Sequence, residues 1–155
     1  MEDVSRERYD WSFSKGKQCE DIFRDRVIAL GHRFKYSSKR DNIERHIDCY
    51  VDGHGVDVKG NRSFDSIWLE TVNVRGNDGW LKGDATYIAF HINESDEFHL
   101  FYREELLQFV KENVREETTS TKDYMKFYSR AKWGKKDVIV RVKYDHIKHL
   151  NVKII

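Results

Sequence analysis

The chain has 155 residues, about the size of one domain, and folding at this length buries roughly two thirds of the unfolded surface, so a core forms without disulfides or structural metals. Apolar residues make up 39% and charged residues 35%, which excludes a disordered chain, and no stretch approaches the roughly 20 apolar residues of a membrane span. Lys and Arg total 28 against 27 Asp and Glu, so any contact with nucleic acid must rest on local patches rather than on net charge.

The composition also predicts a cellular compartment and a domain number. The opening sequence MEDVSRERYD is charged where a signal peptide would be apolar, so we expect neither secretion nor a membrane contact. The two cysteines, Cys19 and Cys49, form no CxxC pair, which argues against a disulfide framework and a zinc ribbon and suits a reducing cytoplasm. Without proline, a Gly/Ser linker or an internal repeat, the chain predicts one domain over residues 1–155.

The amino-terminal half of the chain predicts a helix followed by a hairpin. Apolar residues recur at three-and-four spacing over residues 15–30, which is typical of an amphipathic helix. The pattern changes to alternation over residues 47–60, and the turn residues 52–55 divide that segment into two short strands. Residues rich in β-branched and aromatic side chains predict further strands over 67–74 and 85–92.

The carboxy-terminal half completes an α/β (α+β) pattern. A strand over residues 97–102 leads into a helix whose apolar stripe ends near Val114, and alternating residues from 138 to 144 predict a late strand. We therefore expect a core over about residues 15–114, a basic and aromatic segment over 115–136, and a carboxy-terminal strand region over 137–155. The element order predicts a central mixed β-sheet flanked by helices.

The predicted hairpin carries the chemically informative residues. Asp57 and Lys59 lie two apart on one strand, so they share a face, and Val56 and Val58 share the other. Asp48 on the partner strand has the parity that points it toward Asp57. We expect one apolar face and one polar face, with two carboxylates and one ammonium converging on the polar one.

These residue types suit phosphodiester hydrolysis. Mg²⁺ takes oxygen ligands and is usually held by one or two carboxylates, water and substrate phosphate. A metal and a neighbouring lysine can activate water and neutralise the phosphoryl oxygens. An acid-x-lysine pair also occurs on exposed strands without any function, so the interpretation depends on what surrounds it.

The surrounding order resembles the PD-(D/E)XK nuclease superfamily, the fold of many restriction enzymes, archaeal-type Holliday junction resolvases and phage exonucleases. The resemblance covers roughly residues 15–92 and consists of a helix with Gly16-x-x-x-Glu20, then Asp48, then Asp57-x-Lys59, with eight residues between the two aspartates. Ile47 stands where the motif has proline. The resemblance implies a restriction-endonuclease-like αβββαβ core and a stand-alone enzyme of the resolvase or phage type.

The resemblance also implies residue roles. Mg²⁺ or Mn²⁺ would be bound by Asp48 and Asp57 with the backbone carbonyl of Val58, Glu20 would add a further acid, and Lys59 would act on the water or the phosphate. Glu70 matches the position of a further acid that some members carry after the lysine, and its parity equally suggests a residue at the border of the core that pairs with a local cation.

Basic and aromatic residues outside the hairpin predict the nucleic-acid contacts. Cations for phosphates and rings for bases are the ingredients of such contacts, although the same residues also make an ordinary basic surface. The chain has seven histidines, but no three or four show a familiar zinc spacing. The expected nucleic-acid-binding residues are Lys39, Arg40, His54, Lys82, Arg130, Lys132, Trp133, Lys135 and Lys136.

The sequence therefore predicts a Mg²⁺- or Mn²⁺-dependent nuclease, with DNA as the expected substrate, Asp48, Asp57, Lys59, Glu20 and Glu70 as catalytic residues, and a homodimer as one expected state. Two alternatives stay open. One is a non-catalytic nucleic-acid-binding or assembly module on the same fold, because folds outlive their chemistry. The other is a Holliday junction resolvase, which would need a symmetric dimer to cut two strands.

Overall fold

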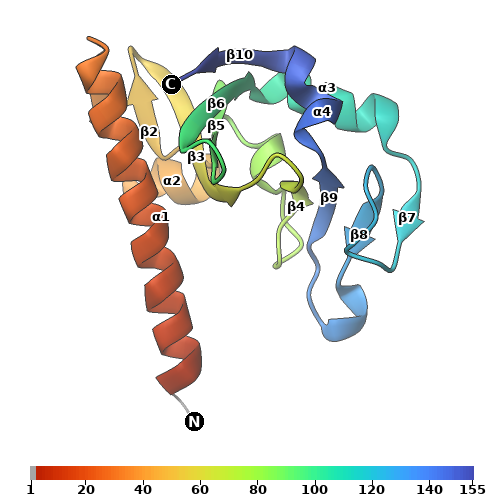
Figure 1. Ribbon diagram of the computed structural model, residues 1–155. Coiled ribbons are helices and arrows are strands. Elements are labelled where there is room, and N and C mark those ends of the chain that lie inside the picture. Colours follow the sequence, from red (N-terminus) through yellow and green to blue (C-terminus); the bar gives the residue numbers. More distant parts are fainter. Residues whose placement is uncertain (1–2) are drawn as a thin grey trace.

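The computed structural model describes residues 3–155, with side chains described for residues 15–131 and 133–155. The fold is mixed α+β, with two mixed sheets and flanking helices (Figure 1), which confirms the expected fold class. The helices are α1 (Asp3–Ala29), α2 (Lys39–Arg45), α3 (Arg103–Asn113) and α4 (Tyr144–Ile147), with short 3-10 turns η1 (Trp80–Lys82), η2 (Ala131–Trp133) and η3 (Lys148–Leu150). No helix within residues 3–155 is long and apolar enough to cross a membrane.

The strands form two separate sheets. The first has the order β1-β2-β3-β5-β6-β10, and its strands are β1 (Phe34–Tyr36), β2 (Cys49–Val51), β3 (His54–Arg62), β5 (Tyr87–Ile92), β6 (Glu97–Tyr102) and β10 (Asn151–Ile154). The second has the order β4-β9-β8-β7, and its strands are β4 (Ile67–Val72), β9 (Val138–Val142), β8 (Phe127–Ser129) and β7 (Glu117–Thr118). β3 and β5 run parallel, and so do β7 and β8, which makes both sheets mixed.

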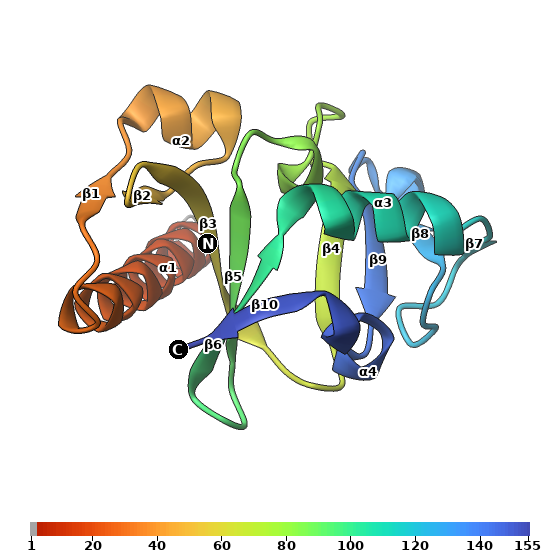
Figure 2. The same ribbon diagram turned by 90° about the horizontal axis from the view of Figure 1, so that it is seen from above.

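The first sheet is covered on both faces. On one face α1 contributes Phe23 and Val27 to a buried cluster with Val56 and Val58 of β3. On the other face a larger core joins the first sheet to the second sheet and to α3 (Figure 2); its members include Leu69, Ile88, Phe90, Leu106, Val110 and Val142. Because β3 lies between these layers, the polar face of the hairpin is not open to solvent: Asp57, which points away from α1, is only 2% exposed.

The predicted hairpin is confirmed, and its turn is shorter than expected. Val51 pairs with His54, which leaves Asp52 and Gly53 as a two-residue turn. Both have positive φ, 49° and 84°. This is the backbone of a type I′ turn, for which an Asp-Gly pair is strongly preferred.

The strands divide between two mixed sheets, where one central sheet was expected. β4 pairs with β9, and β5 lies next to β3. The sequence predicted neither β1 nor α2, and it left β7, β8 and β10 out. Alternation along a strand predicts which residues share a face, but it does not predict which strand pairs with it. Elements of two to seven residues are too short to show a period.

A buried ion pair holds the basic segment to the second sheet. Asp137, directly before β9, is 1% exposed, and its Oδ2 accepts hydrogen bonds from Nε and Nη2 of Arg130 at 3.0 Å and 2.5 Å. A buried carboxylate needs such a partner, because desolvation of an unpaired charge is costly. Arg130, expected to contact nucleic acid, is therefore already engaged by a carboxylate.

We predict that Arg130→Met lowers the free energy of unfolding by about 3 kcal/mol at neutral pH, because it leaves the Asp137 carboxylate buried without a counter-charge. Urea denaturation measures the change, and the double variant Arg130→Met/Asp137→Asn should recover much of it. Arg40→Met is the matched control, since Arg40 is exposed and its pair with Glu44 at 3.0 Å lies at the surface; it should cost less than about 1 kcal/mol. Equal losses of unfolding free energy in Arg130→Met and Arg40→Met would contradict the assignment of Arg130 as the stabilising partner of Asp137.

Candidate active site

A gap in the first sheet lies beside β3. β2 has three residues and β3 has nine, so β2 pairs only with the first three residues of β3, ending at Cys49 opposite Val56. Beyond that pair the carboxylate of Asp48 replaces the missing strand: its Oδ2 accepts a hydrogen bond from the Val58 N–H at 2.7 Å. The N–H and C=O of one strand residue point to the same side, so the Val58 carbonyl faces the same gap.

Asp57 and Lys59 form a buried ion pair next to this gap. Lys59 Nζ lies 3.1 Å from Asp57 Oδ1 and 5.1 Å from the centre of the Trp80 ring. Asp57 Oδ2 is buried, and within the part of the chain with described side chains it has no hydrogen-bond partner. Burial raises the pKa of Asp57 well above its usual range, Asp48 raises it further, and Lys59 lowers it in part. Asp57 is therefore an acid with one oxygen unsatisfied.

Helix α1 brings Glu20 to the same place. A Cβ at Gly60 of β3 would lie 3.3 Å from Cys19 Sγ, so the glycine lets α1 approach the strand closely. Glu20, the next residue, comes within hydrogen-bonding reach of Asp48. Burial and the charge of Asp48 raise the pKa of Glu20 to about 7, and Lys17 opposes this shift. Asp48 thus contacts an acid on each side, Glu20 from α1 and Asp57 from β3.

These acids interact in pairs and do not converge on one point as a set of metal ligands would. In the part of the chain with described side chains, no three His, Cys, Asp or Glu side chains gather as a metal site, so the expected set including Glu20 is not assembled. Asp48 and Asp57 still fit a divalent cation by their chemistry. Mg²⁺ usually takes only one or two carboxylates from the protein, and Oδ2 of Asp57 is a carboxyl oxygen without a hydrogen-bond partner among the described side chains.

Glu70 reaches the site from the second sheet. Its half-buried carboxylate lies near the backbone N–H of Trp80. Burial raises the pKa of Glu70, and the charge of Lys59 lowers it in part. Gly79 permits this arrangement, because a Cβ there would lie 2.6 Å from the Glu70 carbonyl oxygen. Trp80 itself is buried against Phe90, as a cap over the sheet.

Arg62 is a further charged residue near the site, and no sequence pattern indicated it. The pairing of β3 with β5 shifts register between Lys59 and Arg62, and Asn61 has a positive φ of 56°. Arg62 Nη1 donates to the Gly60 carbonyl at 2.7 Å, and the carboxylates of Asp57 and Glu70 oppose the lowering of its pKa by burial. The bulge breaks the alternation on which a sequence-based assignment depends, so no signal in the sequence marked this residue.

A polar cavity of about 720 Å³ opens on the acids, between α1 and α2. Its lining residues are Gly16, Lys17, Glu20, Tyr36, Ser37, Ser38, Lys39, Asn42, Ile43 and Asp48. Asn42 of α2 donates from Nδ2 to Asp48 Oδ1 at 2.7 Å and so fixes the second oxygen of that carboxylate. Neither Asn42 nor the short helix that carries it was predicted from the sequence.

The predicted nucleic-acid-binding residues occupy several surfaces. Lys39 lines the cavity, whereas Lys82 lies exposed at the end of η1. Lys135 and Lys136 are exposed. Trp133 is 60% exposed, with its ring centre 6.5 Å from that of Tyr128. The side chain of Lys132 lies outside the described residues.

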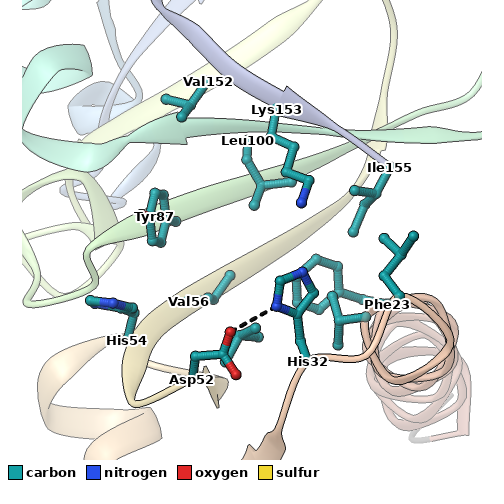
Figure 3. Close-up of a pocket in the computed structure, with 13 residues that line it drawn as sticks. Phe23, His32, Asp52, His54, Val56, Tyr87, Leu100, Val152, Lys153 and Ile155 are labelled. Atoms are coloured by element: carbon teal, nitrogen blue, oxygen red, sulfur yellow. Dashed lines mark hydrogen bonds and ion pairs between the residues drawn. The ribbon is translucent and has the colours of Figure 1, made fainter.

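His54 is not brought to the acids. It lies at the start of β3 with the parity of Val56, and it lines a second, apolar cavity of about 200 Å³ with Tyr87 and Leu100 (Figure 3). Its ring meets the edge of Tyr87, with 6.0 Å between the ring centres. Nearby, His32 Nδ1 and Asp52 Oδ2 are 2.7 Å apart. The predicted contact of His54 with nucleic acid near Asp57 stays a prediction without support from this geometry.

Comparison with known proteins gives little further information. No protein-family model matches the chain, and no curated protein matches it. Among solved structures, the bacterial homing endonuclease I-Ssp6803I is similar over 60% of this chain and 66% of its own, just under two thirds of its length. The sequence identity is 18% and the TM-score is 0.43. Similarity at this level identifies neither a family nor an activity.

We predict that the acids make the metal-free protein less stable as the pH rises. The Glu20 carboxyl has a pKa of about 7 in the folded protein against 4.5 as its ordinary value, so the folded state holds its proton more tightly and loses stability between about pH 4.5 and 7. At pH 8 Glu20→Gln should raise the free energy of unfolding by about 1–2 kcal/mol, allowing for solvent screening of a partly exposed group.

Urea denaturation in EDTA at pH 5 and pH 8 measures this difference. The gain should shrink in an Asp48→Asn background, because the repulsion between the two acids is already gone. A pH dependence that is the same in wild type and in Glu20→Gln would refute the assignment of Glu20 to this acid pair.

Proposed function

We propose that this protein is a metal-dependent nuclease that hydrolyses phosphodiester bonds in nucleic acid, with DNA as its substrate. The observation that carries the proposal is the ion pair between the buried Asp57 and Lys59, next to Asp48, which itself lines a polar cavity. Asp48, Asp57 and the carbonyl of Val58 would hold Mg²⁺ or Mn²⁺. When bound, such an ion supplies Lewis-acid stabilisation of phosphoryl charge and a water of lowered pKa.

The chain's own side chains would orient the reacting groups and neutralise the phosphoryl charge. Asp48 is fixed by Asn42 on one oxygen and by the Val58 N–H on the other, so its carboxylate is held in place before any substrate arrives. Lys59 is held by Asp57 and by the Trp80 ring, and its ammonium group would neutralise the phosphoryl oxygens as charge develops on them. Glu20, with a pKa of about 7, is suited to proton transfer near neutral pH.

The arrangement of charge favours an enzyme over a binding module. Asp57 carries a buried, unsatisfied oxygen beside Asp48, and Asp48 in turn contacts Glu20. Mutual repulsion of buried acids costs stability, and perturbed acids of this kind cluster at functional sites. A module that only bound phosphates would gain nothing from them. A dimeric resolvase would use the same site, and its dimer stays a prediction.

We predict that Asp57→Asn and Lys59→Met each lower the cleavage rate at least about 100-fold, because each removes charge that acts in the transition state. The assay uses labelled single-stranded, duplex, flap and four-way junction DNA, and the matching RNA strands, with Mg²⁺, Mn²⁺ or EDTA. Glu104→Gln is the control, since its side chain is 88% exposed on α3. Cleavage that survives in either active-site variant would remove that residue from the site, and no cleavage by wild type on any substrate would favour the binding module.

We further predict that Mn²⁺ stabilises the protein through the two aspartates. At a hundredfold excess over its dissociation constant, an ion that binds only the folded state adds about 2.7 kcal/mol, which is seen as a higher melting temperature. The affinity should rise with pH, because the raised pKa of Asp57 makes a proton compete with the ion. Calorimetry should give weaker binding for Asp57→Asn. Equal Mn²⁺ affinity in wild type and this variant would show that the ion binds elsewhere.

A further inference from the structure

Helix α2 contributes nothing to the core. None of its seven residues is buried. A helix of this length is not stable alone in water, so contacts outside the helix must hold it. Those contacts are polar: the Ser38 cap on the Asp41 N–H, Asn42 to Asp48, Tyr50 to Asp41 and Arg45 to Asp84. The helix is thus anchored by polar contacts at the edge of the first sheet, near β1 and β2 (Figure 2).

The one apolar side chain of α2 faces solvent at the cavity. Ile43 is 63% exposed, more than any other large apolar side chain in the part of the chain with described side chains. It lines the 720 Å³ cavity and directly follows Asn42, the residue that holds Asp48. Burial of this side chain against a ligand would remove apolar surface from water, which would favour binding.

The rest of the cavity suits a nucleotide. Lys17 and Lys39 supply positive charge. Lys17 Nζ lies 3.6 Å from Asp21 Oδ1 and 3.7 Å from the centre of the Tyr36 ring, whereas Lys39 has no ion-pair partner among the described side chains. Ser37 and Ser38 add hydroxyl groups, and the acids Glu20 and Asp48 lie in the same lining. A volume of about 720 Å³ lies within the range of roughly 300–1,000 Å³ that encloses a drug-sized ligand, and one nucleotide is of that size.

We propose that this cavity binds one unstacked nucleotide next to the scissile phosphate, with its base against Ile43 and its phosphate at Lys39 and Lys17. The identity of the occupant rests on the proposed nuclease function. In a stacked duplex only the edges of the bases are accessible, through the grooves. An apolar side chain buries the most surface against the face of a base that has left the stack. The preferred substrate is therefore nucleic acid with an unpaired or easily unpaired base at the cleavage point.

The test uses oligonucleotides with 2-aminopurine, whose fluorescence rises on unstacking, in an Asp57→Asn background that keeps the substrate intact. Binding should raise the fluorescence when the probe is unpaired or lies at a mismatch. Ile43→Ala should abolish that rise and weaken single-strand binding about 5- to 10-fold, because the apolar contact between the base and the side chain is lost. Ile43→Leu should restore both. Lys39→Ala should weaken binding and lower the slope of log affinity against log salt by about 0.7.

Ile28→Ala is the matched control, because Ile28 is 52% exposed on α1 and outside the cavity lining. It should change neither fluorescence nor affinity. If Ile43→Ala behaves like Ile28→Ala while unmodified protein still cuts DNA, the nucleotide site is wrong and the nuclease stands. If the fluorescence rise depends on Ile43 but nothing is cut, the site stands and the nuclease is wrong. If no oligonucleotide binds, both are wrong, and Ile43 is left as a contact for another protein.

Discussion

The unequal length of β2 and β3 is the constraint on which the candidate site depends. Where β2 ends, the backbone of β3 keeps its hydrogen-bonding groups, and a buried N–H without an acceptor costs free energy. At Val58 the acceptor of this N–H is the carboxylate of Asp48. Once this carboxylate is held against the strand, its other oxygen accepts from Asn42, which anchors α2, and Glu20 of α1 comes within reach. A short strand thus gathers groups from four segments of the chain.

Two ion pairs with a buried carboxylate differ in how completely that carboxylate is hydrogen-bonded. Arg130 binds both oxygens of Asp137, so that carboxylate is fully paired and its role is structural. Lys59 contacts one oxygen of Asp57 and leaves the other without a donor. Nearly all buried polar groups in folded proteins are paired, so an exception needs an explanation. Under the proposed function, a divalent cation beside Asp48 would be the partner of this oxygen.

The second sheet and the first sheet meet at the candidate site. Glu70 comes from β4, Trp80 from the turn after it, and Lys59 from β3, and the lysine lies over the tryptophan ring. The packing of the two sheets therefore determines where the ammonium group points. α1 closes the opposite side through the close approach of Cys19 to Gly60. Rigid elements thus hold the charged groups, which favours the defined geometry that catalysis needs.

The sequence by itself determined the elements with a clear period and the identity of the chemical residues. The helix that carries Glu20 and the Asp-Gly hairpin follow from local spacing and turn chemistry, and Asp57 and Lys59 share a face because a strand alternates. Only the tertiary structure decided that Asp57 is buried, that β5 rather than β4 lies beside β3, and that Arg62 and Asn42 join the site. Those outcomes depend on which segments pack together and on a bulge that shifts the register. Neither leaves a periodic signal along the chain, because pairing and burial are set by contacts between residues far apart in sequence.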